Sequence, residues 1–270
     1  GTASSFFGAP AQFAISSDGR RLAFVALDKV GRRLLYVKGL NGSPAVALPG
    51  TLGAVNPFWS PDGQYIAFAT DGKLQKFHAV GGSSRRLPVL VCEFRGSAES
   101  TTPGTWNQDD VILFTSSALQ LGAIHRVAAS GGTLVPVTTI DPRHDRHESP
   151  SFLPDGHHFM YDARGPGAQR NIYIASLKSK ARRLLIQDGS RAMYAQGRLL
   201  FARRNTLMAQ AFDIDQLKLT GDPVAIIDLL EASRVTGRDG VFSVANADVL
   251  VYQPHADTQS ITVVRRWTEQ

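Results

Sequence analysis

The most constraining feature of this sequence is a short strand-turn pattern that the chain repeats. "SPDGQYIAFAT", which begins at Ser60, combines a polar Ser-Pro-Asp-Gly turn with a short alternating apolar run. This combination predicts a tight turn that leads into a half-buried β-strand. "SSDGRRLAFVA" from Ser16 and "LPDGHHFMYDA" from Leu153 have the same form. A unit that recurs in this way predicts a repeat architecture.

The pattern extends to six copies. An aromatic residue holds the equivalent strand position in each copy, at intervals of 40 to 51 residues: Phe24, Phe68, Phe114, Tyr161, Phe201 and Tyr252. Each copy has a short inner strand before the turn, the strand with the aromatic residue, and room for two more strands. A period of this length is typical of a propeller blade. We therefore predict an all-β, six-bladed β-propeller of four-stranded antiparallel blades, with residues 1–270 as a single domain.

The last copy lacks an outer strand, so the ring needs another way to close. The copy ends at "ITVVRRW", whereas residues 1–7 lie where an outer strand would precede the first inner strand. We expect residues 1–7 to pair with "ITVVRR", because a closed ring has no exposed sheet edges. The missing strand and the bare N-terminus also lead us to expect a fragment of a longer protein.

Composition excludes several classes of function. The chain has 270 residues, a net charge of +6 and a single cysteine, Cys92, so neither an intrachain disulfide nor a cysteine zinc site can form. Its arginine doublets are scattered, so we expect no nucleic-acid partner. No apolar run approaches the roughly 20 residues that cross a bilayer, so we expect no membrane span. We expect a monomer without a cofactor.

Familiar catalytic motifs are missing from the sequence. It has no G-x-S-x-G elbow, no P-loop and no G-x-G-x-x-G fingerprint, and His147-Glu148 does not continue as H-E-x-x-H. The paired acids Asp109 and Asp110 fall at a predicted hairpin turn, where catalysis would lack a facing partner. The sequence therefore favours a function without catalysis.

One segment concentrates residues that could bind a ligand or a metal ion. "DPRHDRHESPSF" contains His144, Asp145, His147 and Glu148, and we expect it to be the loop before an inner strand that begins at Ser151. Imidazole and carboxylate groups suit zinc, manganese or nickel, and they also suit a polar or anionic ligand. Three interpretations remain open: an exposed charged loop, a contact with a ligand or partner, and a metal site with His144, His147 and Glu148 as weak candidates.

Residues just before the inner strands form a second candidate site. We expect them to point toward the mouth of the central channel, where they could bind a peptide or small ligand or hold ordered water. The set contains Gln12, Asn56, Pro103, Ser149 and Arg191.

The Asp-Gly turns have a structural explanation. We expect each aspartate to accept a hydrogen bond from the backbone N–H two residues on, and each glycine to adopt a positive φ. These structural turn residues are Asp18, Gly19, Asp62, Gly63, Asp155 and Gly156.

The sequence also resembles a known family. "AISSDGRRLAFVA", "FWSPDGQYIAFATDGKLQK" and "SFLPDGHHFMYDARG" resemble the WD40-like repeat of TolB-type propellers. "PGTWNQDDVILFTSS", "RVAASGGTLVPVTTIDP" and "TLMAQAFDIDQLKLTGDPV" are similar to the propeller that follows the kinase domain in bacterial, especially acidobacterial, serine/threonine kinases. The resemblance covers nearly the whole chain and implies a sensor or scaffold domain on the extracytoplasmic side of a bacterial membrane. Kinase motifs are absent from the sequence, so no phosphoryl transfer is implied.

Two functions from different classes are therefore considered. The first is a recognition or sensor module that binds a protein or small ligand over the channel face. The alternative is a metal-dependent, lyase-like propeller enzyme centred on residues 141–148. An enzyme needs an acid, a base and metal ligands that converge within a few ångströms, whereas a binding module needs only a shaped face. The fold by itself does not decide between them.

Overall fold

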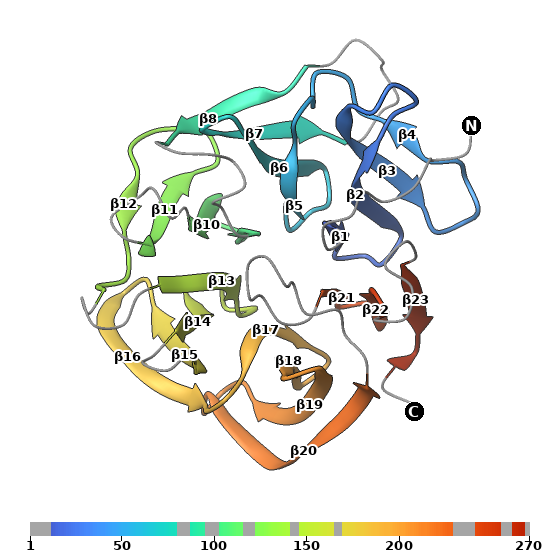
Figure 1. Cartoon of the computed structure of the whole chain (residues 1–270). Coiled ribbons are helices and arrows are strands. Elements are labelled where there is room, and N and C mark those ends of the chain that lie inside the picture. Colours follow the sequence, from blue (N-terminus) through green and yellow to red (C-terminus); the bar gives the residue numbers. More distant parts are fainter. Residues whose placement is uncertain are drawn as a thin grey trace.

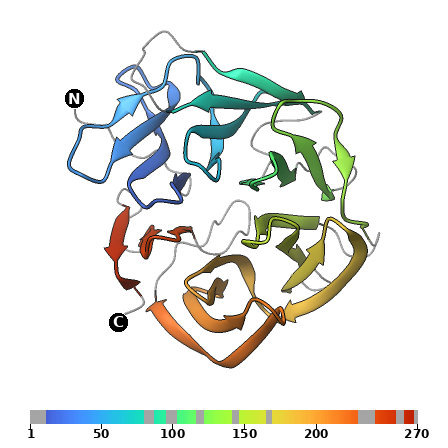
Figure 2. The ribbon, with the colours of Figure 1, turned by 180° about the vertical axis from the view of Figure 1, so that it is seen from behind.

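The computed structural model arranges the chain as six antiparallel sheets in a ring. The structure describes residues 12–79, 87–94, 103–115, 122–140, 146–164, 169–228, 241–254 and 261–267. The sheets follow one another round a central axis in sequence order (Figure 1), and the view from behind shows the same ring (Figure 2). The all-β six-bladed propeller predicted from the repeat is confirmed.

Each sheet is one blade, and its strands pair in sequence order from the inside outward. Blades 1 to 3 contain β1 (Phe13–Ile15), β2 (Arg21–Leu27), β3 (Arg33–Gly39) and β4 (Val46–Ala47); β5 (Val55–Trp59), β6 (Tyr65–Thr70), β7 (Lys73–His78) and β8 (Val89–Glu93); and β9 (Thr105–Trp106), β10 (Val111–Thr115), β11 (Ile124–Ala128) and β12 (Val135–Pro136). Blades 4 to 6 contain β13 (Arg146–Phe152), β14 (His158–Arg164), β15 (Arg170–Ser176) and β16 (Ser179–Ile186); β17 (Ser190–Ala195), β18 (Arg198–Arg203), β19 (Thr206–Asp213) and β20 (Lys218–Asp228); and β21 (Phe242–Ala245), β22 (Val249–Tyr252) and β23 (Thr262–Arg265).

The apolar core is divided into six layers, one between each pair of neighbouring blades. Because a blade is covered on both faces, its second strand is buried almost throughout, as in β2 and β14. This two-sided burial explains the nearly continuous apolar runs of the repeat. The inner strands contact one another in turn round the ring, from β1 through β5, β9, β13, β17 and β21 back to β1.

Blade 6 meets blade 1 directly. Phe13 and Ile15 of β1 share an apolar layer with Ala245 and Val251 of blade 6. The backbone N–H of Ile15 also donates to Ser243 Oγ at 3.1 Å. In the described part of the chain blade 6 has three strands. The expected pairing of residues 1–7 with β23 lies outside the described residues and stays a prediction.

The Asp-Gly turns connect the first and second strands of blades 1, 2 and 4, and they have the expected geometry. Each aspartate Oδ1 accepts the backbone N–H two residues on, at 2.9 to 3.0 Å: Asp18 from Arg20, Asp62 from Gln64 and Asp155 from His157. The glycines have φ angles of 68°, 67° and 74°: Gly19, Gly63 and Gly156. This is the left-handed region, which glycine adopts without a steric cost.

Side chains at the turns between the first and second strands of blades 1, 3 and 5 also bond to the turn of the following blade. Five such hydrogen bonds lead from a side-chain donor to a backbone carbonyl of the next blade: Ser17 to Pro61, Arg21 to Gly63, Asn107 to Gly156, Gln108 to Pro154 and Gln196 to Asn246. They fix the turns of adjacent blades relative to one another. No described helix is long and apolar enough to cross a membrane.

Candidate functional site

The structure places His147 and Glu148 within strand β13, which corrects the expectation of a loop before Ser151. Both residues are buried, with 1% and 9% of their surfaces exposed. The strand begins at Arg146 because a bulge at Ser149, which has a φ of 52°, accommodates Pro150 without ending the strand. Proline is tolerated there because the channel side of an inner strand needs no ladder hydrogen bond. His144 and Asp145 lie outside the described residues.

Glu148 belongs to a buried ionic cluster inside blade 4. Nη1 of Arg170, at the start of β15, donates to Glu148 Oε2 at 2.9 Å and to Asp162 Oδ2 at 2.8 Å. Glu148 and Asp162 are register partners on β13 and β14, so the sheet itself brings the two carboxylates together. Asp162 is 1% exposed and Arg170 is 7% exposed. Buried charges of this kind are maintained only when they are paired.

The cluster holds more negative than positive charge, and this affects its protonation. Burial raises the pKa of Asp162 to about 6, Arg170 opposes the rise, and the negative charge of Glu148 adds to it. Burial disfavours the charged form of Arg170, but the two carboxylates outweigh this effect and raise its pKa. Nη2 of Arg170 is buried and has no hydrogen-bond partner among the described residues.

His147 is held as a neutral side chain. Its Nδ1 lies 2.9 Å from Thr138 Oγ1, and its Nε2 lies 3.2 Å from Nη1 of Arg182 on β16. Because arginine can only donate, Nε2 accepts and Nδ1 carries the proton. Burial, together with the positive charge of Arg182, lowers the pKa of His147 to about 4. Tyr161 packs against the imidazole, with ring centroids 4.7 Å apart.

These contacts argue against a metal site at His147 and Glu148. The ring nitrogen and the carboxylate that would bind the ion already face the guanidinium groups of Arg182 and Arg170. Two fixed positive charges at the candidate ligands oppose a cation. The structure therefore gives no support to the weak metal candidates His147 and Glu148: Glu148 belongs to the buried ionic cluster, and His147 is bonded to Thr138 and Arg182.

Sequence reasoning missed Asp162, Arg170 and Arg182. A signal for Asp162 was present, because it follows the repeated aromatic residue of its copy. The residues at this position in the other copies are uncharged: Val25, Ala69, Thr115, Ala202 and Gln253. A carboxylate in a strand buried on both faces requires a buried cation, and this requirement predicts a partner such as Arg170.

Three residues of the second candidate set lie at equivalent positions of blades 2, 4 and 5. Asn56, Ser149 and Arg191 have φ angles of 51°, 52° and 48°, and each lies at a bulge within its inner strand, not before it as expected from the sequence. Gln12 does precede β1, and its Oε1 accepts the Asn56 backbone N–H at 2.8 Å. Asp162 Oδ1 accepts the Arg191 N–H at 3.4 Å, which connects this set to the buried cluster.

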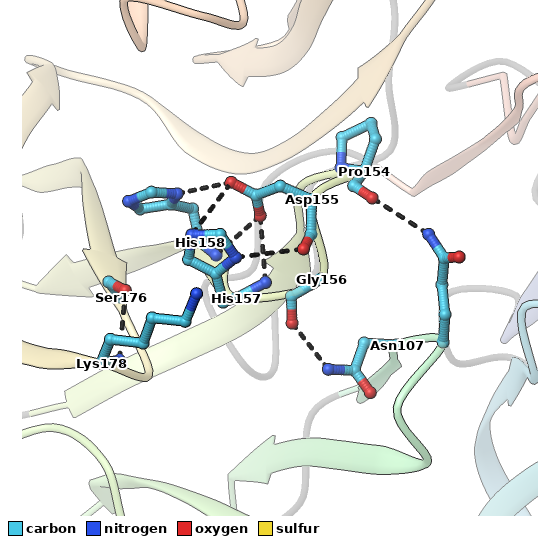
Figure 3. Close-up of polar contacts among 9 residues, drawn as sticks. Asn107, Pro154, Asp155, Gly156, His157, His158, Ser176 and Lys178 are labelled. Carbon is cyan, nitrogen blue, oxygen red and sulfur yellow. Dashed lines mark hydrogen bonds and ion pairs between the residues drawn. The ribbon is translucent and has the colours of Figure 1, made fainter.

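The opposite end of β13 carries another group of imidazole and carboxylate side chains (Figure 3). Asp155 Oδ2 lies 2.5 Å from Nδ1 of His158 and 3.7 Å from Nε2 of His157. Burial opposes ionisation of Asp155, but hydrogen bonds from the His158 side chain and from the backbone of both histidines lower its pKa. The carboxylate is therefore charged beside two imidazoles.

A wide cleft of about 1730 Å³ lies away from both candidate sets, on the outer side of blade 1. Its lining comes from blade 1 and from parts of blades 2 and 6, including Arg32, His78, Asp248 and Arg265. It contains the turn residues Asp18 and Gly19 but none of the residues expected to bind a ligand.

Comparisons with known proteins identify the fold. No family model and no curated protein matches this chain. TolB from Acinetobacter baumannii is 17% identical with a TM-score of 0.58, and the match covers 80% of this chain but 55% of that one. A putative TolB from Agrobacterium tumefaciens is also 17% identical, with a TM-score of 0.63 and coverage of 85% and 84%. An oligogalacturonate lyase from Vibrio parahaemolyticus is 12% identical, with a TM-score of 0.53 and coverage of 95% and 90%.

Identities this low establish the fold alone. The chain spans about half the length of the A. baumannii protein. Together with the six sheets and their strand order, these likenesses show that the chain is a six-bladed β-propeller with a TolB-like fold.

Proposed function

We propose that this propeller is a non-catalytic recognition module, which binds a protein segment or a small ligand at the channel end where the inner strands bulge. The observation that carries the proposal is the repeated left-handed backbone at Asn56, Ser149 and Arg191. Left-handed non-glycine residues cost on the order of 1–3 kcal/mol each and cluster at functional sites. Bulges re-aim side chains and recur beside binding sites.

The repeat brings these three positions to one level of the channel. Each inner strand begins a blade and has the same place in its sheet, so equivalent residues lie in a ring round the axis. Ser149 and Arg191 are partly exposed and offer a hydroxyl and a guanidinium group, whereas Asn56 is buried. Arg191 also lies over the ring of Phe242, 5.7 Å from its centroid, and this fully buried ring helps to hold the guanidinium group between blades 5 and 6. A guanidinium group held in this way suits a peptide that carries a carboxylate.

The buried cluster supports binding over catalysis. A general acid or base must reach the substrate, whereas His147, Glu148 and Asp162 are buried and bonded to protein groups. The lyase-like alternative required metal ligands at His147 and Glu148, and these side chains face arginines. The likeness to oligogalacturonate lyase extends to the fold and does not favour that chemistry here.

A finer form of the proposal is that the module is the sensor domain of a bacterial serine/threonine kinase and lies on the extracytoplasmic side. This form rests on the sequence resemblance of the repeats. An antibody against the propeller should then detect, in cells of the source organism, a polypeptide much larger than 29.2 kDa that becomes phosphorylated with ATP. A band at 29.2 kDa alone would contradict the kinase link but not the recognition function.

The recognition function can be tested with a random peptide library. Peptides enriched on the immobilised propeller are titrated by fluorescence anisotropy against the wild type and Arg191→Asn. Asparagine occupies the equivalent position in blade 2 and tolerates a positive φ, so this variant removes the guanidinium group but keeps the backbone. We expect its affinity to fall at least about tenfold, because a charge-assisted hydrogen bond is lost.

The matched control is Arg126→Asn, which removes an exposed arginine from the third strand of blade 3. We expect this control to bind like the wild type. Failure to enrich any peptide, or equal affinity of the wild type and Arg191→Asn, would contradict recognition at this end of the channel.

A further inference from the structure

We propose that Asp155, His157 and His158 form a binding site for a divalent transition-metal ion of the zinc class, on the turn between β13 and β14. One ligand atom from each side chain lies within 4.8 Å of the others. Among the residues that the structure describes, no other group of three histidine, cysteine or acidic side chains is placed in this way. The turn lies at the end of β13 opposite the Ser149 bulge, so the site is independent of the proposed recognition function.

The ligand geometry is close to what one ion requires. Zinc binds imidazole nitrogen and carboxylate oxygen at about 2.0–2.2 Å, so two of its ligand atoms can be up to roughly 4 Å apart. Asp155 Oδ2 lies 2.5 Å from His158 Nδ1 and 3.7 Å from His157 Nε2. Only a small movement of the imidazoles is needed. Between 26% and 30% of each side chain is exposed, so an ion can enter from solvent.

The turn of blade 4 differs from the turn of blade 2 in the hydrogen bonds that its aspartate accepts. In blade 2 the Ser60 hydroxyl donates to Asp62 Oδ1 at 2.6 Å and accepts the Tyr65 N–H at 2.9 Å. Blade 4 has Leu153 at the position of Ser60, and this leucine is buried in the apolar layer between blades 4 and 5.

In blade 4 the aspartate replaces that serine as acceptor. Asp155 Oδ1 accepts two backbone N–H groups, from His157 at 3.0 Å and from His158 at 2.9 Å. One carboxylate oxygen therefore fastens the turn, and Oδ2 remains directed at the two imidazoles (Figure 3). The equivalent pairs in the other Asp-Gly turns contain no histidine: Arg20-Arg21 and Gln64-Tyr65.

The preceding blade holds this turn in place. Asn107 Nδ2 donates to the Gly156 carbonyl at 2.6 Å, and Gln108 Nε2 donates to the Pro154 carbonyl at 3.1 Å. The backbone is thus fixed on both sides of Asp155. Partners that position the first ligands in this way are typical of protein metal sites.

The surroundings also favour a cation. Oδ2 of Asp109 lies 3.7 Å from the point where a Cβ on Gly156 would be, which brings a second carboxylate to the turn. A nearby negative charge attracts a cation.

The donor set defines the class of ion. Two imidazoles with one carboxylate suit zinc, iron, cobalt or nickel, whereas magnesium and calcium prefer oxygen ligands. Three protein ligands leave a coordination position open for water or an external ligand. Coordination through His158 Nδ1 requires that any proton on that nitrogen moves to Nε2 or leaves to solvent.

Calorimetric titration of Zn²⁺ into the tag-free protein tests the proposal. We expect one ion per chain, and no detectable binding to His158→Ala or His157→Ala. Asp155→Asn keeps an oxygen acceptor for the two backbone N–H groups but removes the charge, so the turn is preserved while affinity falls at least about tenfold. Asn107→Ala, which removes a positioning contact, should weaken binding about tenfold. The visible spectrum of the Co²⁺ form should show four-coordinate geometry that is lost in His158→Ala.

Another histidine provides the control. His78 is not a member of the group, and His78→Ala should bind Zn²⁺ like the wild type. Circular dichroism melts of every variant check that the propeller is folded. A wild type without heat of binding, unchanged binding in His158→Ala and Asp155→Asn, or loss of binding in His78→Ala would overturn the proposal.

Discussion

Blade 4 has histidine and carboxylate residues at both ends of its inner strand, and the two groups differ in burial and in their partners. At one end His147 is 1% exposed and bonded to Thr138 and Arg182, and the next residue, Glu148, is bonded to Arg170. At the other end Asp155 and His158 are each more than a quarter exposed, and water can reach them. Similar residue types therefore occur as buried residues bonded to protein groups at one end and as the exposed group that we propose to bind a metal ion at the other.

This difference shows that residue type and spacing do not define a site. The segment around His147 was the richest in metal-binding residues, yet its charges are neutralised inside the blade. The Asp155 turn follows a repeat whose obvious role is to turn the chain. An Asp-Gly turn gains a set of metal ligands only where two histidines follow the glycine and the serine two residues before the aspartate is absent.

The largest expected effect is at the buried end. Arg170→Met leaves two buried carboxylates without their cation, and this should destabilise the fold by about 3–5 kcal/mol, measured by urea unfolding. Arg126→Met, on the exposed face of β11, should change stability by no more than about 0.5 kcal/mol. Adding Glu148→Gln and Asp162→Asn to Arg170→Met should recover part of the loss. Equal stability of the two single variants would contradict a buried ionic cluster.

The second prediction concerns the pH dependence of stability. Burial and Arg182 lower the folded-state pKa of His147 to about 4, from a value of 6.5 in the unfolded chain. The stability that this shift contributes is complete above pH 6.5 and is lost as the pH falls toward 4. The full loss is on the order of 3 kcal/mol.

Asp162 acts in the opposite direction. Burial raises its folded-state pKa to about 6 from 3.8, so its contribution is present at low pH and is lost as the pH rises through 6. Unfolding curves of the wild type and His147→Gln at about pH 7 and about pH 4.5 separate the two effects. His147→Gln should lose less stability on acidification than the wild type. The same loss in both proteins would show that His147 is not buried in its neutral form.

At the exposed end, substitutions that strain the backbone should lower the stability of the fold more than loss of a side chain. Gly156→Val and Gly63→Val both force a β-branched side chain into a positive φ and should cost about 1–3 kcal/mol. Gly63→Val should be the worse of the two, because its Cβ meets Arg21 Nη2 at 3.1 Å, whereas the nearest atom at Gly156 is 3.7 Å away. Thermal melts give the order, and the reverse order would contradict these turn contacts.

The smallest expected effect is loss of the aspartate itself. Asp155→Ala in metal-free buffer should cost about 1 kcal/mol through loss of its turn hydrogen bonds, and so should Asp62→Ala. Asp155→Asn should be close to neutral, because an oxygen acceptor remains. A loss at Asp155→Ala comparable to that of Arg170→Met would remove the contrast between the two ends of blade 4.

The frame of this protein could be predicted because it depends on a local pattern repeated six times. Asp62 and Gly63 predict a turn because of their own hydrogen-bonding and backbone preferences. The alternating apolar residues up to Phe68 predict a strand. Each copy supports the interpretation of the others, so the blade number follows from simple counting. The weaker turns at Gln196 and Asp248 retain a positive φ without the Asp-Gly sequence.

The candidate site could be predicted only in part because it depends on contacts between strands. The burial of His147 requires Thr138 and Arg182, which lie 9 and 35 residues away. The bulge at Arg191 has no signal in its own sequence, whereas Pro57 and Pro150 follow the bulges at Asn56 and Ser149. Pairing of this kind is set by register and packing, which a single sequence does not display.

The direction of the five turn-to-turn hydrogen bonds has a consequence for synthesis on the ribosome. In each bond the donor side chain is made first, and the carbonyl that it binds follows 42 to 50 residues later. At translation rates of about 5–20 residues per second, that interval is roughly 2–10 s. The donors of a newly synthesised blade are therefore exposed to water until the next blade is made. They then help to set the angle at which the next blade packs.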